Sequence, residues 1–496
     1  MLSKDEIVKS VPQKGFFGHP KGLFTLFFTE FWERFSYYGM RAILLYYMYY
    51  ELNHGGLGLD RTTANTVMAI YGSLVYMSGI IGGYLADRIL GTRKAVFYGG
   101  ILIMIGHILL ALPGSATMLF ASMFFIIIGT GLLKSNVSTI VGDMYSEDDE
   151  RRDAGFSIFY MGINMGAFLS PLIIDRVYQA AGFHAGFSIA AFGMALGLIV
   201  YVVTSKNTLG LAGINPPNPM TKAEKKKMSI IAIIAVIVIV ALVFIAKATG
   251  NLSVANFSLV ITTLGILIPT ILFTYMYRSP KTTTEEKSRV LAYIPLFIAA
   301  VMFWAIADQS ATILATYADT RVNLMIGSFE ISPVWFQSLN PMFIILLAPL
   351  FATLWMKLGV RNPSTPRKFS YALFFAGASF FLMVIPGMLS NGGETLVSPW
   401  WLVGSFFLAV IGELMLSPVG LSATTKLAPA AFAGQTMAIW FLASAAASAI
   451  NAQLVRIYAV VSEVTYFGVL GAFAVLIGVI ILMISPIISR AMKGVK

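Results

Sequence analysis

Long apolar stretches separated by short polar segments make up almost the whole of the 496-residue chain. Most stretches continue for about 20 residues without the alternation of a strand, which is the length that an α-helix needs to cross the hydrocarbon core of a bilayer. The pattern therefore predicts an all-α integral membrane protein. Fourteen membrane-spanning helices are expected, with approximate bounds 22–51, 63–86, 95–112, 118–141, 154–174, 185–204, 228–246, 256–277, 290–316, 332–356, 369–387, 397–421, 432–455 and 464–485.

The distribution of basic residues among the loops indicates how the spans are oriented. If both termini lie inside the cell, the inside loops and tails hold 26 of the 34 Lys and Arg residues, and the outside loops hold five. Basic residues are enriched on the cytoplasmic side of membrane proteins. The asymmetry supports an even number of spans and a multi-pass protein with both termini cytoplasmic.

The long inside loop 205–227 divides the chain. It is rich in proline and lysine, and the two spans that follow it carry few polar side chains. We interpret these two spans as an insert between two six-helix halves, because Phe31-Trp32 in the first span is echoed by Phe303-Trp304 in the ninth. Such repeats are typical of transporters whose binding site lies between the halves. The predicted organisation is a cytoplasmic tail (1–21), an N-terminal six-helix bundle (22–204), cytoplasmic linkers with a two-helix insert (205–289), and a C-terminal six-helix bundle with a cytoplasmic tail (290–496).

Composition narrows the classes of function. The net charge of +11 comes from residues in short loops rather than on a soluble domain, so the lipid bilayer and not nucleic acid is the expected partner. The chain has no cysteine, which excludes disulfides, thiolate catalysis and cysteine-based metal sites. It also lacks HExxH, GxSxG, P-loop and DFG-type motifs. We therefore expect neither an enzyme nor an ATP-driven pump, and no metal site or bound cofactor.

The first span carries six polar or charged side chains on one face. Their positions are i, i+3, i+4, i+7, i+8 and i+11, which form a single stripe on an α-helix. An ionised side chain at the bilayer centre costs roughly 2.5–3.5 kcal/mol on insertion scales, so the stripe is expected to face protein or water. It indicates a path for a charged substrate or a proton. The six residues are Glu30, Glu33, Arg34, Tyr37, Tyr38 and Arg41.

Ionisable residues within the spans suggest what the substrate looks like. Three are cations and four are carboxylates, and buried charges need partners. The carboxylate left over must be protonated, reach water, or meet a cation that arrives with the substrate. Proton coupling and a substrate ammonium group follow from this balance, while Arg34 and Lys134 suit a substrate carboxylate. The seven residues are Glu30, Glu33, Arg34, Arg41, Lys134, Asp308 and Glu413.

Two alternatives remain open for these charges. They can be structural ion pairs that hold helices together, or functional groups on a transport path. Asp308 and Arg41 both lie toward the outer half of their spans, so a bridge between them would hold an outer gate shut until Asp308 is protonated. His107, in the third span, can be a hydrogen-bonded packing residue or a proton relay.

Two further motifs carry structural information. The segment 83–94, from Gly83 through Asp87 and Gly91, resembles the loop signature of the major facilitator superfamily, with one extra residue between Asp87 and Gly91. In the fifth span Gly162 and the glycine four residues later form a helix-packing pair. Asn164 lies between these two glycines, and its amide needs a partner such as a substrate backbone.

Together the motifs resemble the proton-dependent oligopeptide transporter family. The resemblance rests on Glu30-x-x-Glu33-Arg34-Phe35-Ser36-Tyr37-Tyr38, on Phe159-Tyr160-Met161-Gly162-Ile163-Asn164 and on Gly129-x-Gly131-x-x-Lys134-x-Asn136. It implies the major facilitator fold of two six-helix bundles plus a two-helix insert, located in a bacterial cytoplasmic membrane. It also implies proton-coupled symport of di- and tripeptides into the cytoplasm by alternating access, with the proton as coupling ion.

The resemblance also implies roles for individual residues. Arg34 and Lys134 would receive the peptide carboxylate. At position 308, where many bacterial relatives carry Glu, this chain has Asp, one methylene shorter. The proton-coupling and gating residues would be Glu30, Glu33, Arg34, Arg41 and Asp308. The amino end and backbone of the peptide would meet Asn164, Asn340, Glu413 and Ser444. The side-chain pockets would be lined by Tyr37, Tyr38, Tyr76, Trp304 and Trp440.

Rival functions stay open at this point. They are a fourteen-span drug–proton antiporter, a transporter of another anion such as nitrate, and a membrane sensor of peptides that transports nothing. The sequence also leaves open the peptide side-chain preference, the proton-to-peptide ratio, the affinity and the transport of peptide-like drugs. We expect the monomer to be the functional unit, although the sequence does not give the oligomeric state.

Overall fold

The computed structural model describes residues 3–146 and 148–494, and nearly all of these residues are helical. Fourteen helices in this part of the chain have 20 residues or more. They are α2 (Gly22–Tyr49), α3 (Arg61–Leu85), α4 (Thr92–Ala111), α5 (Ala116–Asp143), α6 (Arg152–Ala181), α7 (Phe183–Thr208), α8 (Lys222–Ala248), α9 (Val254–Arg278), α10 (Thr284–Ala307), α12 (Leu339–Leu358), α13 (Thr365–Leu389), α14 (Trp400–Leu427), α15 (Ala433–Tyr458) and α16 (Glu463–Ala491).

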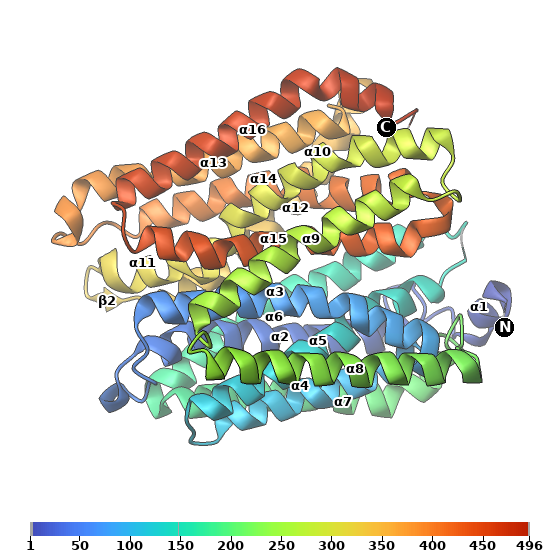
Figure 1. The fold of residues 1–496 in the computed structure, drawn as a ribbon, viewed down its shortest axis with the longest axis horizontal. Helices are drawn as coiled ribbons and strands as arrows, with labels where there is room; N and C mark the ends of the chain where they lie inside the picture. The colour runs from blue at the N-terminus through green and yellow to red at the C-terminus, as the bar shows by residue number, and fades with distance from the viewer. Residues whose placement is uncertain (1–2, 147, 495–496) are drawn as a thin grey trace. The chain divides into compact units, whose positions relative to one another are not determined.

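Short elements complete the fold (Figure 1). The two short helices are α1 (Lys4–Ser10) and α11 (Ile313–Arg321). One antiparallel hairpin is formed by β1 (Met325–Ile326) and β2 (Phe329–Glu330). The short stretches of 3-10 or π helix are η1 (Leu52–His54), η2 (Ala86–Leu90), η3 (Asp308–Ala311), η4 (Pro333–Ser338), η5 (Gly359–Arg361), η6 (Asn391–Gly393) and η7 (Ala430–Phe432).

The length and hydropathy of the long helices fit a membrane protein. Within the described residues, thirteen helices are long and apolar enough to cross a bilayer. The remaining long helix is α2, which has 28 residues and carries the charged stripe. The predicted all-helical membrane fold is confirmed.

Local sequence signals start several of the helices. Thr221 accepts a hydrogen bond from the backbone of Glu224, whose side chain bonds back to Thr221, and this capping box begins α8. Thr283 and Glu286 form the same arrangement at the start of α10. Such caps satisfy backbone N–H groups that have no partner within the helix. They fix the first residue of each helix next to a polar loop.

The predicted ninth span, 290–316, lies within the candidate span Thr284–Arg321, but the helix is interrupted there. In the structure α10 ends at Ala307, η3 follows, and Thr312 has a non-helical backbone (φ −128°, ψ −98°) before α11 begins. The side-chain amide of Gln309 donates to the carbonyl of Ala305 at 2.9 Å and accepts from the hydroxyl of Tyr466 at 3.0 Å. Side-chain hydrogen bonds thus compete with the backbone pattern of the helix. The break places Asp308 at the end of a helix rather than inside one.

The first of two compact units consists of the described residues of Met1–Ser36, Met77–Ile163 and Ser188–Val260. In this unit α4 packs against α5. A Cβ atom added at Gly99 would lie 2.7 Å from the carbonyl oxygen of Gly129, and one added at Gly129 would lie 2.6 Å from that of Gly99. The two backbones therefore meet at a contact that only glycine permits, as is common between membrane helices.

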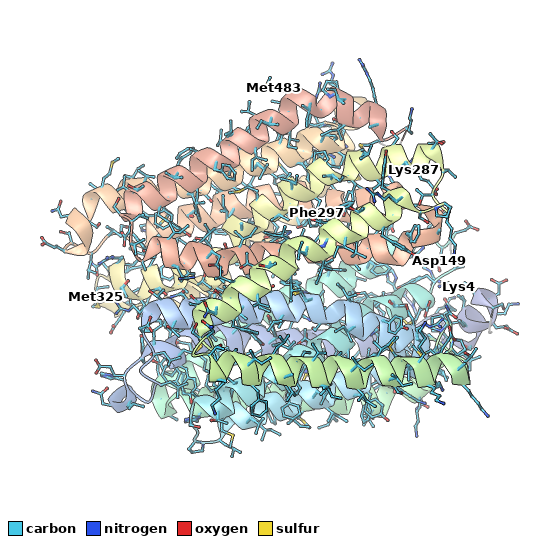
Figure 2. The ribbon with its side chains drawn as sticks, viewed as in Figure 1. Lys4, Asp149, Lys287, Phe297, Met325 and Met483 are labelled. Carbon is cyan, nitrogen blue, oxygen red and sulfur yellow. The ribbon has the colours of Figure 1, made fainter. Side chains whose placement is uncertain are left out.

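The second unit consists of the described residues of Tyr37–Tyr76, Asn164–Phe187 and Ile261–Lys496. In this unit α13 packs against α14 and α16, and α13 and α16 run side by side in Figure 1. Its core contains the fully buried rings of Phe303, Phe369, Phe380 and Phe467. Figure 2 shows Met483 projecting outward from α16, where its side chain is 74 % exposed. An apolar outer surface of this kind suits contact with lipid.

The helix α8 is apolar on all sides and buries none of its residues in the protein. Lys222, Lys225, Lys226 and Lys227 gather at its N-terminal end. Arg88, from η2, bonds to Glu224 in the first turn of α8 at 2.7 Å. An apolar helix with a basic end fits the predicted insert, which would contact lipid and keep its basic end at the cytoplasmic surface.

A buried histidine lies where the N-terminal segment folds back. His19 Nδ1 lies 3.1 Å from the hydroxyl of Tyr145. Arg151 forms an ion pair with Asp149 at 2.8 Å and donates to the carbonyl oxygen of Gly18 at 3.2 Å. Burial first, and then the nearby Arg151 guanidinium, lower the pKa of His19. The hydrogen bonds from Arg151 lower the pKa of Asp149.

Candidate functional site

A buried ion-pair cluster occupies the part of α2 that belongs to the first unit. Arg34 Nε lies 2.9 Å from Glu30 Oε1 and 2.6 Å from Glu33 Oε2. All three residues are at most 2 % exposed. Helical spacing accounts for the first of these contacts, because Glu30 and Arg34 are four residues apart and therefore lie on the same face of α2.

Each carboxylate of the cluster has one oxygen that accepts no hydrogen bond from the described part of the chain and makes neither of the short contacts to Arg34 given above. Glu30 Oε2 and Glu33 Oε1 are buried, and neither has a hydrogen-bond partner among the described residues. A buried oxygen atom without a donor is costly unless something else binds to it. These two oxygens are therefore positions at which a proton can be held.

Lys134 adds a second cation to this cluster. It lies on α5, in the same unit, close enough to interact electrostatically with both Glu30 and Glu33. Asn136, two residues further along α5, donates to the carbonyl oxygen of Leu132 at 2.7 Å. With Lys134 included, the cluster contains two carboxylates and two cations, so its charges balance when none of the carboxylates is protonated.

A second group of charges lies in the second unit. Arg41 has Tyr37, Tyr38, Tyr76 and Asp308 as electrostatic neighbours. The rings of Tyr37 and Tyr38 meet edge to face, with centroids 5.3 Å apart. The predicted bridge between Arg41 and Asp308 stays a prediction, and the structure places both residues in one unit.

Glu413 is held by an amide from a neighbouring helix. Asn340 Nδ2, on α12, donates to Glu413 Oε2, on α14, at 2.9 Å. Asp308 is an electrostatic neighbour of Glu413. A cavity of about 20 Å³ lies beside Asn340 and is also lined by Ser310 and Ser405. That volume is enough for about one water molecule, with polar groups to bind it.

The helix α15 carries a stripe that the sequence identified only in part. Trp440, Ser444 and Ser448 follow one another at intervals of four residues. Trp440 is 5 % exposed, and its ring lies against Phe369 with centroids 6.4 Å apart. A Cβ atom at Gly420 would overlap that ring, so α14 and α15 approach closely here. Ring packing is thus part of what Trp440 does.

Ser448 was missed by the sequence analysis. Its hydroxyl donates to Asp308 Oδ2 at 3.0 Å. The sequence feature that could have indicated its role was its position, four residues after Ser444 on the same face of α15. Serine is too common in helices for that position alone to indicate a role.

A hydrogen-bond network around α11 was missed as well. The hydroxyls of Tyr49 and Tyr50, at the end of α2, both donate to Asp319 on α11 at 2.7 Å. Asn65 Nδ2, on α3, donates to Thr316 Oγ1 on α11 at 2.9 Å. These contacts join the ends of two N-terminal helices to the C-terminal half. They depend on tertiary pairing, which residue spacing along one helix does not reveal.

The predicted site residues are divided between the two units. Glu30, Glu33, Arg34 and Lys134 lie in the first unit, where the structure brings them together. The other predicted residues lie in the second unit, where electrostatic contacts or hydrogen bonds connect Arg41 to Asp308 and Asn340 to Glu413. These residues are Tyr37, Tyr38, Arg41, Tyr76, Asn164, Trp304, Asp308, Asn340, Glu413, Trp440 and Ser444.

Comparison with known proteins identifies the family. A model described as "POT family" matches residues 93–488. The uncharacterized transporter YclF of Bacillus subtilis (strain 168) is 60 % identical over 494 residues, covering 100 % of this chain and 99 % of that protein. The di-/tripeptide transporter of Lactococcus lactis subsp. cremoris is 46 % identical over 491 residues, covering 98 % and 99 % of the two chains.

A solved structure supports the same assignment. The crystal structure of a mutant of a peptide transporter, POT, in complex with alafosfalin is 62 % identical in sequence, with a TM-score of 0.94 and full coverage of both chains. The expected major facilitator-type fold and the expectation of a transporter rather than an enzyme are therefore confirmed. By its sequence motifs, its fold and these similarities, the chain belongs to the POT family.

Proposed function

We propose that this protein carries out proton-coupled symport of di- and tripeptides into the cytoplasm by alternating access. The observation that carries the proposal is the buried cluster of Glu30, Glu33 and Arg34, in which each carboxylate has one oxygen without a donor among the described residues. The similarity to a protein named as a di-/tripeptide transporter supplies the substrate class. The coupling ion is the proton, and no cofactor is needed.

Charge balance explains how a proton and a peptide become coupled. Glu30 and Glu33 face Arg34 and Lys134, so the empty cluster is neutral. A peptide carboxylate that binds to Arg34 and Lys134 adds a negative charge in a buried place, which is unfavourable. Protonation of one glutamate removes that excess and weakens its hold on Arg34. Peptide and proton therefore bind best together.

The amino end of the peptide would meet carboxylate and amide groups of the second unit. Glu413, held by Asn340, is the proposed partner of the peptide ammonium group, with Ser444 beside it. Asn164 would bond the peptide backbone. The side chains of the peptide would lie in pockets lined by Tyr37, Tyr38, Tyr76, Trp304 and Trp440.

Gating is proposed to depend on Arg41 and Asp308. Their attraction would stabilise the closed outer gate, and protonation of Asp308 would remove it. The network around α11 that joins Tyr49 and Tyr50 to Asp319 would support the same closed state. Asp308, one methylene shorter than Glu, is bonded by Ser448, which holds the short side chain in one position.

The proposed setting is a bacterial cytoplasmic membrane, with both termini in the cytoplasm and the monomer as functional unit. Peptide-like drugs are proposed as further substrates, because a similar transporter has been crystallised with alafosfalin. The rival assignments, to a drug–proton antiporter or to a nitrate transporter, predict that dipeptides do not compete for uptake.

Uptake of labelled dialanine into liposomes that contain the purified protein tests the proposed function. Accumulation above the external concentration is expected when an inward proton gradient is imposed, and unlabelled dipeptide should compete. Lys134→Ala should abolish uptake, whereas Lys247→Ala, at an exposed position in the last turn of α8, should leave it unchanged. Absence of uptake by folded wild-type protein, together with accumulation of nitrate or an organic cation, would contradict the proposal.

A further inference from the structure

The second unit contains a cavity far larger than the one beside Asn340. Its volume is about 670 Å³, within the range of pockets that hold small molecules. It lies among the start of α3, the helix α11, the ends of α13 and α15, and the start of α16. The polar part of its lining includes Arg61, Asn65, Thr320, Arg321, Tyr458 and Glu463.

The location of this cavity separates it from the transport residues. In the predicted topology Arg61 and Arg321 belong to outside loops, so the cavity lies at the outer face of the membrane. None of the residues proposed above to bind peptide or proton lines it. The cavity is therefore a separate place on the molecule.

The lining of the cavity contains a cation, Arg61, that can still bind an anion. The Arg61 side chain is exposed, and its guanidinium carbon lies 5.7 Å from the centroid of the Tyr49 ring. Among the residues that the structure describes, Arg61 forms no ion pair with a carboxylate. A guanidinium in this situation can bind a carboxylate through two parallel hydrogen bonds.

The lining also contains a carboxylate, that of Glu463, with one oxygen that can accept a further hydrogen bond. Glu463 Oε1 accepts from Arg321 Nε at 2.7 Å and from the hydroxyl of Tyr458 at 3.1 Å. Its second oxygen, Oε2, accepts no hydrogen bond from the described part of the chain. The side chain is 14 % exposed, so Arg321 and Tyr458 hold it in place while Oε2 can accept from an ammonium group.

We propose that this cavity is an outer binding site for short zwitterionic peptides, which reach it before they enter the transport path. Arg61 binds the peptide carboxylate and Glu463 binds the ammonium group. The hydroxyl of Thr320 donates to the carbonyl oxygen of Thr316, so its oxygen can accept a hydrogen bond from the peptide backbone. The proposal rests on the proposed function, because it takes peptides as the substrate. A phosphate group that carries no ammonium would use Arg61 but leave the open oxygen of Glu463 without a partner.

Equilibrium binding of labelled dialanine to purified Lys134→Ala protein tests the outer site, because this variant lacks one of the two proposed partners of the peptide carboxylate in the transport path and should bind weakly there. Residual binding is expected, and adding Arg61→Gln should weaken it about tenfold, as the loss of a charge-assisted hydrogen bond predicts. Arg456→Gln is the matched control, since this arginine lies at the end of α15 and does not line the cavity. Equal binding by both double variants, or no residual binding, would overturn the proposal.

Uptake kinetics separate this proposal from the proposed function. In an otherwise wild-type background, Arg61→Gln should raise the dialanine concentration for half-maximal uptake several-fold without lowering the maximal rate, and Glu463→Gln should do the same. If wild-type protein takes up dialanine and Arg61→Gln matches it at every concentration, the outer site is wrong and the transport function stands. If wild-type protein takes up no dialanine, the proposed function itself fails.

Discussion

Ser448 donates a hydrogen bond to Asp308 across 3.0 Å and thereby joins α15 to the point at which α10 ends. Asp308 lies next to Gln309, which is anchored by Tyr466. The carboxylate is thus fixed from two sides, by its own hydrogen bond and by the anchored turn that carries it. This arrangement gives a short acidic side chain a defined position near Arg41.

Removing the hydroxyl of Ser448 should impair transport. Ser448→Ala is expected to lower the rate of proton-driven dialanine uptake about three- to tenfold, because a hydrogen bond to a charged group is lost. Ser448→Thr keeps the hydroxyl and should retain most of the rate. Initial rates in proteoliposomes at equal protein content measure both. Equal rates for Ser448→Ala and wild type would show that the hydrogen bond has no part in gating.

Position 308 should tolerate a longer acid but not an amide. Asp308→Glu keeps the charge, so proton-driven uptake is expected to remain within about fivefold of wild type, the cost of repositioning one hydrogen bond. Asp308→Asn keeps the size but loses the titratable group, and it should lose proton-driven uptake while retaining exchange of dialanine across the membrane. Uptake and exchange are measured on the same vesicles. Proton-driven accumulation by Asp308→Asn would remove this residue from the coupling mechanism.

Much of the fold follows from short-range features of the sequence. Apolar stretches located the long helices, and the spacing of Glu30, Glu33 and Arg34 placed these three residues on one face of the first long helix. The break at Asp308–Thr312 was missed, because it contains neither glycine nor proline and depends on a hydrogen bond from Tyr466, far along the chain. The bonds of Asp319 to two tyrosines were missed for the same reason. Features that depend on contacts between distant helices leave little trace in local sequence.

The crossing of α4 and α5 should be sensitive to a single methyl group. Gly129→Ala would place a Cβ atom 2.6 Å from the carbonyl oxygen of Gly99, so the helices must move apart and the melting temperature should fall by several degrees. Gly468→Ala, on α16, meets only ordinary contact at 3.7 Å and should be neutral or slightly stabilising, because alanine favours helix by up to about 1 kcal/mol. Thermal unfolding of the detergent-purified proteins compares them. A similar effect of both substitutions would contradict the close crossing.

The stability of the N-terminal segment should depend on pH through His19. The pKa of His19 is lowered from its ordinary value of 6.5, so the unfolded chain binds a proton more readily than the folded protein. Stability should therefore fall as the pH drops from about 7 through 6.5 towards the lowered pKa of the folded state, and level off below it. The lowered pKa of Asp149 acts in a separate, more acidic window, near and below its ordinary value of 3.8.

Replacing His19 tests this dependence. His19→Gln cannot be protonated and should show a smaller decrease in melting temperature between pH 7.5 and pH 5.5 than wild type. His54→Gln, at an exposed position in η1, is the matched control and should behave like wild type. Identical pH dependence in all three proteins would mean that His19 does not titrate in this range.

Proton entry driven by dialanine tests directly whether one buried cluster binds proton and peptide together. Proteoliposomes without an imposed pH gradient receive external dialanine, and a pH-sensitive dye reports the internal pH. Coupling through this cluster predicts that dialanine drives protons inward, and that Glu33→Gln abolishes this acidification while labelled dialanine still exchanges across the membrane. Entry of dialanine with no acidification in wild-type protein, or undiminished acidification in Glu33→Gln, would contradict it.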